Sequence, residues 1–463
     1  MVKDEAFSGC QEISRRPVFY IRIHEKIHMN TKYSLPKDIY AKSYGGFMLI
    51  ISPSSGNWIV LNSQQQIDIL KSLIDGLTLS EIHERFSSQE IAEVIAQIEG
   101  RKFMQADDEA ESEDASTLRL YLTSKCNLRC THCFMYASEA LDDELTTGEI
   151  FGLIEGCRNY GCVKVILTGG EVLTRNDFGD ILKFADSLGM YVQVLTNGTL
   201  WSEENVHELS GYIDEVQISI DGYDEASNAE IRGRNAFAQA MNALDMFTSE
   251  DNILTVAVIT PLYEGLENHR TEYRDFMKAL TERYMNKNFL ALIQSELIDG
   301  RNLKADFERN MLMSQTVKEI HEEIYENSEL TAFIMNHRDR RVFRNCGYGN
   351  ITVSSTGDVY FCGRIHDVRK YANLRDTSFD EIMHMRRLVR KFTGADYVMP
   401  YRECELKYIC GGGCRVKNFP DAVRSDIENF GNVFFRRNIE CTAEDKERLY
   451  RLMIESNSFL MMR

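Results

Sequence analysis

Residues 118–133 read LRLYLTSKCNLRCTHC, and this stretch decides the fold. Its first half, 118–124, is a short apolar run that predicts a buried β-strand. Three cysteines follow at once, Cys126, Cys130 and Cys133. A buried strand that ends in three closely spaced thiols indicates a ligand site at the carboxyl end of that strand.

The chain has 12 cysteines and no apolar secretory segment at its N-terminus, which favours metal ligands or catalytic groups over disulfides. Structural zinc sites prefer four protein ligands, and the nearby His132 lies between the cysteines, where it is poorly placed. Three thiolates with an open fourth position suit an iron–sulfur cluster that keeps one iron for a substrate. Zinc stays open as the alternative. Cys10, Cys157 and Cys162 stand apart and are expected to be small apolar filler or surface thiols.

The composition excludes several classes of protein. The formal net charge of −18 over 463 residues argues against general nucleic-acid binding, because neutralising phosphates needs a basic face. No apolar run is long enough to span a membrane. With 43% apolar residues the chain can build a sizeable core, and we expect a cytoplasmic protein of two to four domains.

Strands and helices are expected to alternate after the opening stretch. The predicted strands are 118–124, 163–167, 192–195, 215–220, 254–259 and 289–293. The predicted helices between and after them are 147–161, 177–188, 203–211, 226–248 and 267–285. This order predicts an α/β fold with a parallel sheet, as a partial (β/α)6 barrel of the TIM type. Such folds place their chemistry at the carboxyl ends of the strands.

Polar and glycine residues stand at several of those strand ends. Gly169, Gly170 and Glu171 follow the second strand, where glycines allow a close approach and a carboxylate complements an ammonium group. Thr196 and Asn197 end the third strand, with helix capping an equally good interpretation. Ser219 and Asp221 end the fourth strand, and Arg232 follows them.

These residues together resemble the radical SAM superfamily, whose CxxxCxxC signature CNLRCTHC matches. The resemblance implies that Cys126, Cys130 and Cys133 are the catalytic ligands of a 4Fe-4S cluster, with the fourth iron left for S-adenosyl-L-methionine (SAM). It implies SAM contacts from the following residues: Gly169, Gly170, Glu171, Asn197, Ser219, Asp221 and Arg232. His132 is a modest departure, because the signature often has an aromatic residue there.

The C-terminal cysteines resemble the SPASM extension of peptide-modifying radical SAM enzymes. Residues 351–362 are expected to form a hairpin with its turn at 356–358, and six of the seven SPASM cysteines are present, the missing one falling at Tyr401. The resemblance implies two auxiliary 4Fe-4S clusters, one held by Cys346, Cys362 and Cys414 and the other by Cys404, Cys410 and Cys441. Glu403, Glu405, Tyr401 or a substrate thiol could complete these sets. A single auxiliary cluster, or a zinc site, stays open.

The N-terminal part predicts a hairpin, 47–52 and 58–61, followed by three short helices that each begin with a capping box. Ile91, Val94, Ile95 and Ile98 share one face of the last helix. The pattern resembles a winged helix and, within peptide maturases, the PqqD-like leader-peptide recognition domain, which captures a peptide as an added strand. DNA binding competes, but five basic against seven acidic residues over 40–104 disfavour it.

The expected domains are therefore six. They are an N-terminal extension, 1–39, with a possible added strand; the winged-helix-like recognition domain, 40–104; an acidic linker, 105–117; the radical SAM partial barrel, 118–300; a helical connector, 301–345; and the SPASM auxiliary-cluster domain, 346–463.

The resemblance as a whole implies a radical SAM oxidoreductase that matures ribosomally made peptides, closest in layout to the thioether-forming enzymes of sactipeptides and ranthipeptides. It implies that SAM yields a 5′-deoxyadenosyl radical, which takes a hydrogen from the core peptide before a substrate cysteine sulfur bonds to that carbon. The implied partners are the precursor peptide and an electron donor such as flavodoxin or ferredoxin. Carbon–carbon crosslinking, epimerisation and sulfatase maturation are alternatives within the class. An iron–sulfur peptide-binding or sensor protein is the alternative outside it.

Overall fold

A computed structural model describes residues 31–104, 116–325, 327–337, 343–419, 422–424, 435–436 and 441–461. The predicted added strand within 1–30 and almost all of the predicted acidic linker, 105–115, lie outside the described residues. None of the described helices is long and apolar enough to cross a membrane.

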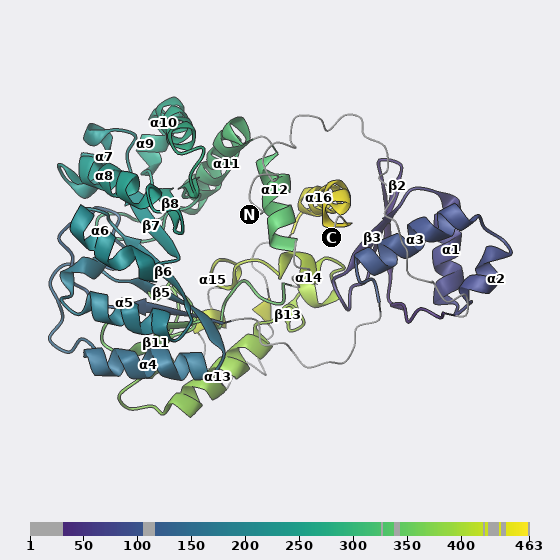
Figure 1. The fold of residues 1–463 in the computed structure, drawn as a ribbon, viewed down its shortest axis with the longest axis horizontal. Coiled ribbons are helices and arrows are strands. Elements are labelled where there is room, and N and C mark those ends of the chain that lie inside the picture. Colours follow the sequence, from purple (N-terminus) through teal and green to yellow (C-terminus); the bar gives the residue numbers. More distant parts are fainter. Residues whose placement is uncertain are drawn as a thin grey trace.

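A mostly parallel sheet of nine strands lies in the left part of the view in Figure 1, in the order β12-β11-β10-β4-β5-β6-β7-β8-β9. Its parallel strands are β4 (Ser116–Tyr121), β5 (Cys162–Thr168), β6 (Tyr191–Thr196), β7 (Glu215–Ile220), β8 (Leu254–Ile259) and β9 (Phe289–Ile293). All six predicted strands are therefore confirmed. Their sequential order means that the strand ends named above meet at one edge of the sheet.

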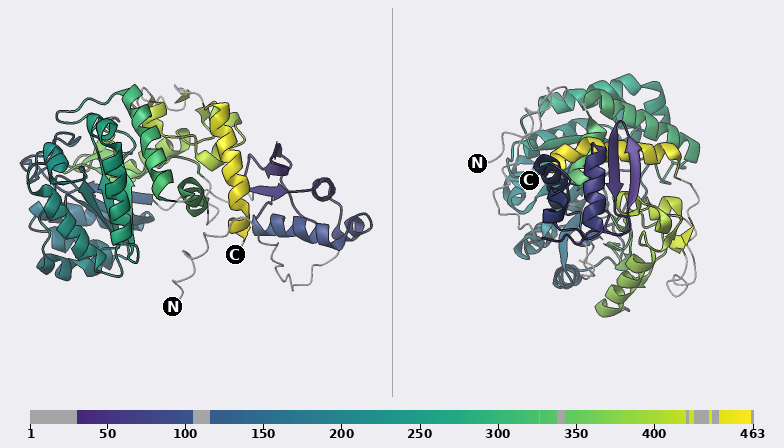
Figure 2. Two further views of the ribbon diagram at one scale, coloured as in Figure 1. Left: turned by 90° about the horizontal axis from the view of Figure 1, so that it is seen from above. Right: turned by 90° about the vertical axis from the view of Figure 1, so that its right-hand side faces the viewer.

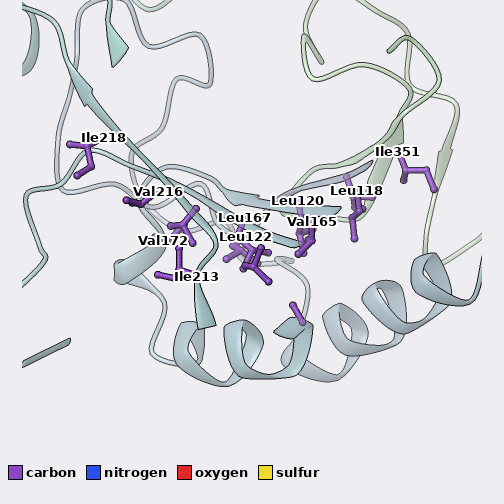
Figure 3. Close-up of a cluster of buried hydrophobic side chains, with 14 of the residues drawn as sticks. Leu118, Leu120, Leu122, Val165, Leu167, Val172, Ile213, Val216, Ile218 and Ile351 are labelled. Atoms are coloured by element: carbon purple, nitrogen blue, oxygen red, sulfur yellow. The ribbon is translucent and has the colours of Figure 1, made fainter. Parts of the chain in front are cut away.

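Helices cover one face of this sheet. They are α4 (Thr147–Asn159), α5 (Phe178–Ser187), α6 (Glu203–Leu209), α7 (Glu225–Arg232), α8 (Ala236–Thr248), α9 (Tyr263–Asn268), α10 (Arg270–Arg283) and α11 (Phe307–Ile324). Alternate strand residues point toward them and build the main core, as the labelled Leu118, Leu120 and Val165 show (Figure 3). Cys157 and Cys162 are fully buried in this core, as expected for apolar filler.

Two predicted helices are each divided in two. The predicted helix 226–248 is wrong as a single element, because Gly233, with φ 94°, and Asn235, with φ 67°, separate α7 from α8. Both backbones are left-handed and cannot continue a right-handed helix. The predicted helix 267–285 likewise divides at His269 into α9 and α10.

The predicted C-terminal hairpin is confirmed as β10 (Ile351–Val353) and β11 (Asp358–Tyr360), with Gly357 left-handed at its turn. It does not stand apart from the parallel strands. Strand β10 pairs in parallel with β4, with Ile351 opposite Leu118, and β12 (Ala372–Asn373) extends the sheet beyond β11. The hairpin that leads to Cys362 is therefore part of the same sheet as the first cysteine loop.

The N-terminal unit combines three strands with three helices. The strands are β1 (Tyr40–Tyr44), β2 (Phe47–Ile51) and β3 (Trp58–Leu61), and the helices are α1 (Gln64–Ile74), α2 (Leu79–His83) and α3 (Ser88–Gly100). Ser63, Thr78 and Ser87 each cap a helix by accepting from its backbone, but only Thr78 with Glu81 forms the predicted capping box. The predicted boxes at Ser63 and Ser87 are wrong, because in the described part of the chain no side chain returns a hydrogen bond to the backbone N–H of either cap. The sequence did not predict β1, which pairs antiparallel with β2.

The C-terminal part contains α12 (Ser328–His337), α13 (Phe379–Phe392), α14 (Lys407–Cys410), α15 (Arg415–Asn418) and α16 (Ala443–Met461), with the short strands β13 (Val398–Met399) and β14 (Phe435–Arg436). Helix α16 lies between the N-terminal unit and the rest of the molecule (Figure 2). There Leu49 and Trp58 share a core with Met453 of α16, with Ile409 of α14 and with Leu406, which precedes α14. The N-terminal unit is therefore packed directly against the loops that carry Cys404 and Cys410.

Candidate active site

The loop that carries the first three cysteines runs from β4 toward α4 and is tied down by its backbone. The Cys126 N–H donates to the Ser138 carbonyl (2.9 Å), and the Thr131 N–H donates to the Ile231 carbonyl at the end of α7 (3.0 Å). The Asn302 N–H in turn donates to the Thr131 carbonyl (2.8 Å). One contact within the loop and two contacts with distant segments therefore fix the cysteine loop at the carboxyl edge of the sheet.

Gly169 and Gly170 let the end of β5 pass directly against this loop. A Cβ on Gly170 would lie 2.2 Å from the Lys125 carbonyl oxygen, and one on Gly169 would lie 2.6 Å from that of Thr123. The Glu171 N–H then donates to the Lys125 carbonyl (2.9 Å). The two glycines thus allow the end of β5 to approach the backbone of the cysteine loop closely.

Glu171 lies buried between the ends of β5 and β6. Its carboxylate accepts hydrogen bonds from the Thr196 hydroxyl and the Asn197 N–H, both at 2.7 Å. Burial raises the pKa of this carboxyl, although the same hydrogen bonds oppose the shift. An acid held in this way is a preorganised partner for a cation at the strand ends.

Asn197 joins this carboxylate to the cysteine loop. Its side-chain amide donates to the side-chain Oδ1 of Asn127 (3.0 Å) and lies 3.8 Å from the Cys126 sulfur. The alternative of helix capping does not hold for α6, because Ser202 caps that helix. Thr196 and Asn197 are therefore part of the strand-end network.

Asp221, at the end of β7, is fully buried and forms ion pairs with two residues. Arg232 contacts its carboxylate, and His132 Nε2 lies 2.9 Å from Asp221 Oδ2. Burial by itself raises the pKa of Asp221, but the charges of Arg232 and His132 outweigh it and lower the pKa to about 2. Ser219, two residues earlier on β7, is half-buried on the face away from the helices.

Sequence reasoning did not find the contact between His132 and Asp221. The only signal was that His132 replaces the aromatic residue common in the signature. The pair connects the cysteine loop to the end of β7, so that a residue between two cysteines is held by the third strand after β4. Any effect of Asp221 on a ligand must pass through Arg232 or His132, because its own exposed fraction is 0%.

The first three thiols are a chemically suitable set for an iron–sulfur cluster. All are free cysteines at one loop, and burial raises the pKa of Cys130 to about 11 and raises that of Cys126 as well. Cluster binding would therefore release protons from them. Within the described residues, no three His, Cys, Asp or Glu side chains lie close enough to hold a single metal ion.

Near the end of the hairpin Cys346 and Cys414 are in contact, and Cys362 lies within electrostatic range of Cys414. Cys346 and Cys414 share a hydrogen bond, which together with the charge of Arg415 lowers the pKa of Cys346. Cys362 lies close enough to Cys414 to be affected by its charge. These neighbours belong to the set that the SPASM resemblance implied for one auxiliary cluster, and that ligand set stays a prediction.

Cys404, Cys410 and Cys441 form a second neighbourhood. Cys410 lies within electrostatic range of both Cys404 and Cys441, and burial raises the pKa of Cys404 to about 11. Cys404 begins the turn before α14, Cys410 ends α14, and Cys441 precedes α16. Both sets are thus carried by loops and short helices of the C-terminal part.

The carboxylates considered for completing these sets differ in their surroundings. Glu403 is 70% exposed at its side chain and pairs with Arg402. Glu405 is nearly buried, accepting from Lys446 (2.9 Å) and contacting the Tyr450 hydroxyl. Tyr401 is also buried. Glu405 is the best placed of the three, since its charge acts on Cys404, but it already has two partners.

The central part of the chain matches a protein-family model. Residues 120–276 match the model described as the Radical SAM superfamily. The matched segment runs from β4 into α10 and contains the three cysteines and every strand-end residue described above. It does not reach the C-terminal cysteines.

Two curated relatives carry different names. A protein of Oleidesulfovibrio alaskensis called AdoMet-dependent heme synthase is 27% identical over 322 residues, which is 64% of this chain and 82% of that protein. The Bacillus subtilis sporulation killing factor maturation protein SkfB is 34% identical over 144 residues, 30% of this chain and 34% of that protein.

The fold has a solved counterpart in native anSMEcpe with bound AdoMet and Cp18Cys peptide. That structure aligns with a TM-score of 0.54 at 16% sequence identity, over 74% of this chain and 98% of the other. At this identity the likeness concerns the fold.

Proposed function

We propose, on the premise that the chain is an enzyme of the radical SAM superfamily, that it modifies a ribosomally made precursor peptide and forms thioether crosslinks from its cysteines. One observation carries the proposal. A single chain combines a strand-end site with three thiols, two further sets of three thiols in loops, and a separate N-terminal unit of strands and helices. A second and third thiol site suit a substrate that itself contains thiols.

In this proposal Cys126, Cys130 and Cys133 hold a 4Fe-4S cluster, and the strand ends hold SAM. Together these groups supply, when bound, a radical able to remove hydrogen from an unactivated carbon. The chain positions the reactants. Glu171 offers a buried carboxylate to the SAM ammonium, and Arg232, held by Asp221, offers a cation to its carboxylate. Ser219 is half-exposed on the same edge and completes the set.

The N-terminal unit is proposed as the leader-peptide site of PqqD-like type. Within the described residues neither outer strand of its sheet, β1 or β3, pairs with a further strand. An extended peptide could add at such an edge through backbone hydrogen bonds. The name of the Bacillus subtilis relative, a killing factor maturation protein, supports a peptide substrate. A flavodoxin or ferredoxin would be the electron donor.

The test is an anaerobic reaction of the protein reconstituted with iron and sulfide. SAM, dithionite and the cysteine-containing short peptides encoded beside its gene are added, and 5′-deoxyadenosine and peptide mass are measured. We expect deoxyadenosine together with a peptide that has lost two hydrogens for each cysteine protected from alkylation. Deoxyadenosine without any loss of hydrogen from the peptides would contradict the thioether chemistry and leave the radical SAM assignment intact.

A second candidate follows from the relatives named AdoMet-dependent heme synthase, which match at 26–27% identity over most of their own length. Heme formation would need a tetrapyrrole substrate in place of a peptide. The same reconstituted protein, incubated with iron-porphyrin carboxylic acids and SAM, tests it by absorbance and mass. Turnover of the porphyrin without turnover of the peptides would favour this candidate.

A further inference from the structure

Three consecutive glycines separate Cys410 from Cys414, and all three have left-handed backbones. Their φ angles are 64°, 78° and 74° for Gly411, Gly412 and Gly413. A run of this kind is open to glycine alone, because a Cβ crowds the following carbonyl. The loop joins a cysteine of the second set to a cysteine of the first.

The loop curls around one buried side chain, that of Arg415. The guanidinium donates to the carbonyls of Gly413 (2.6 Å), Gly411 (2.8 Å) and Thr393 (2.6 Å). A Cβ on Gly412 would lie 3.2 Å from Arg415 Nη1. The glycines are thus needed both for the turn of the loop and for its close fit over the guanidinium.

Arg415 brings a permanent positive charge into the interior. Its exposed fraction is 0%, and within the described residues it has no ion pair with a carboxylate. A buried cation is costly unless an anion compensates it. Three thiols lie within electrostatic range of Arg415, those of Cys346, Cys410 and Cys414, and they would become anions on binding metal. The Arg415 N–H also points to the Cys346 sulfur at 3.4 Å.

We propose that Arg415 is a shared positioning residue of the two C-terminal thiol sites. Its guanidinium fixes the loop that carries one ligand of each site, and its charge raises the reduction potentials of the clusters bound there. The inference rests on the proposed function, because it requires that both sites hold iron–sulfur clusters.

The direction of the effect follows from charge. Reduction makes a cluster more negative, so a nearby buried cation stabilises the reduced form more than the oxidised form. Because Arg415 is in electrostatic range of cysteines of both sets, one substitution should shift both potentials in the same direction. A residue with only a structural role would change iron binding and leave the potential of the bound clusters unchanged.

The experiment uses the full chain in a background in which Cys126, Cys130 and Cys133 are alanine, so that the bound iron is that of the C-terminal sites. Arg415→Gln, Arg415→Lys and, as a matched control, Arg386→Gln are compared by iron and sulfide content and by redox titration followed by electron paramagnetic resonance. Arg386 is also buried and donates to a carbonyl, that of Gly349 (3.0 Å).

We expect Arg415→Gln to lose part of the iron and to shift both midpoint potentials to more negative values. Arg415→Lys keeps the charge but cannot donate to three carbonyls. It should therefore bind less iron, and the clusters that it does bind should keep the parental midpoint potentials. Arg386→Gln should keep the parental potentials. Parental iron and potentials in Arg415→Gln would overturn the inference.

Two further outcomes are decisive. If Arg415→Gln does not fold, Arg415→Lys decides. A lower iron content with parental potentials in Arg415→Lys would support both parts of the inference. A parental iron content with shifted potentials would contradict both parts. If the background protein itself binds no iron, the proposed auxiliary clusters are wrong and the inference is wrong with them. Failure of the inference alone appears as a loaded background protein that Arg415→Gln leaves unchanged.

Discussion

The first cysteine loop and the C-terminal cysteine loops present the same ligand in two different ways. Cys126, Cys130 and Cys133 lie at the edge of a parallel sheet, where strand ends, glycines and a buried carboxylate fix the loop. The C-terminal cysteines lie in loops and one-turn helices, where a left-handed glycine run and a buried arginine do the same task. One site takes its position from the sheet, and the other from a side chain.

This difference has a physical consequence. A site at strand ends is fixed by the main core, so it should persist when the C-terminal loops are altered. A site held by loops has fewer buried contacts of its own and depends on individual residues. The two sites should therefore respond separately to substitution, and the following predictions test that separation.

The largest effect is expected when Cys126, Cys130 and Cys133 are all replaced by alanine. Formation of 5′-deoxyadenosine should fall to the level of a reaction without protein, because no thiolate remains at the strand ends. Iron bound by the C-terminal sites should stay. Iron analysis and mass spectrometry of the same sample measure both. Loss of all iron would show that the two sites do not load independently.

Gly170→Ala should damage the strand-end site alone. The new Cβ would meet the Lys125 carbonyl at 2.2 Å, a backbone atom that cannot move without displacing the cysteine loop. Overpacking of this kind costs about 1–3 kcal/mol or more, so we expect most deoxyadenosine formation and about a third of the iron to be lost. Gly152→Ala, on the exposed side of α4 with nothing within 4 Å, is the matched control and should be neutral.

Glu171→Gln should slow the reaction by roughly 10- to 100-fold. The NH2 group of glutamine cannot accept, so one of two buried donors loses its acceptor, and an unsatisfied buried donor costs about 1–3 kcal/mol. The donors are the Thr196 hydroxyl and the Asn197 N–H. Glu215→Gln is the control, since Glu215 accepts from Lys164 and Gln193 at the opposite end of the sheet. Rates of deoxyadenosine formation measure the difference. Equal effects of the two substitutions would argue against a special role for the strand ends.

The smallest effect concerns the junction between the two regions. The pKa of Glu149 on α4 is lowered to about 2, from an ordinary value of 4.5. The causes are a hydrogen bond from the side chain of Arg375, which follows β12, and one from the Thr146 backbone. A lowered carboxyl pKa adds stability that is fully present above pH 4.5 and is lost as the pH falls toward 2.

At this partly exposed position the contribution is about 1 kcal/mol or less. Urea denaturation of the iron-free protein between pH 2 and 6 should show that Glu149→Gln is destabilised near pH 6 and that its difference from the parent vanishes near pH 2. An unchanged difference across this range would mean that the Arg375 contact does not act through the charge of Glu149.

Much of the central sheet could be predicted from the sequence, because each buried parallel strand is a short apolar run that ends in polar or glycine residues. The strand 215–220 was predicted with the bounds of β7. The break between α7 and α8 was not, since the apolar pattern continues on both sides of Gly233 and only the backbone angles show the interruption.

The candidate site was predictable in its membership but not in its contacts. Spacing identified the cysteines, and position after a strand identified Glu171 and Asp221. The contact of His132 with Asp221 depends on how two distant strand ends meet, and no local pattern encodes it. The same holds for Arg415, which follows a cysteine as an ordinary basic residue and gains its environment only when the glycine loop closes over it.

The pairing of β10 with β4 has a consequence for how the chain reaches its fold. One neighbour of strand β4 in the sheet, β10, lies more than two hundred residues further along the chain, whereas its other neighbour, β5, follows soon after it. During synthesis on the ribosome the free edge of β4 is therefore exposed until the hairpin emerges, and such edges invite pairing with other chains. Contacts of this sequence separation also slow folding. A protein truncated before residue 351 would leave that edge of β4 permanently unpaired. The sheet can be completed only in a chain that includes the hairpin.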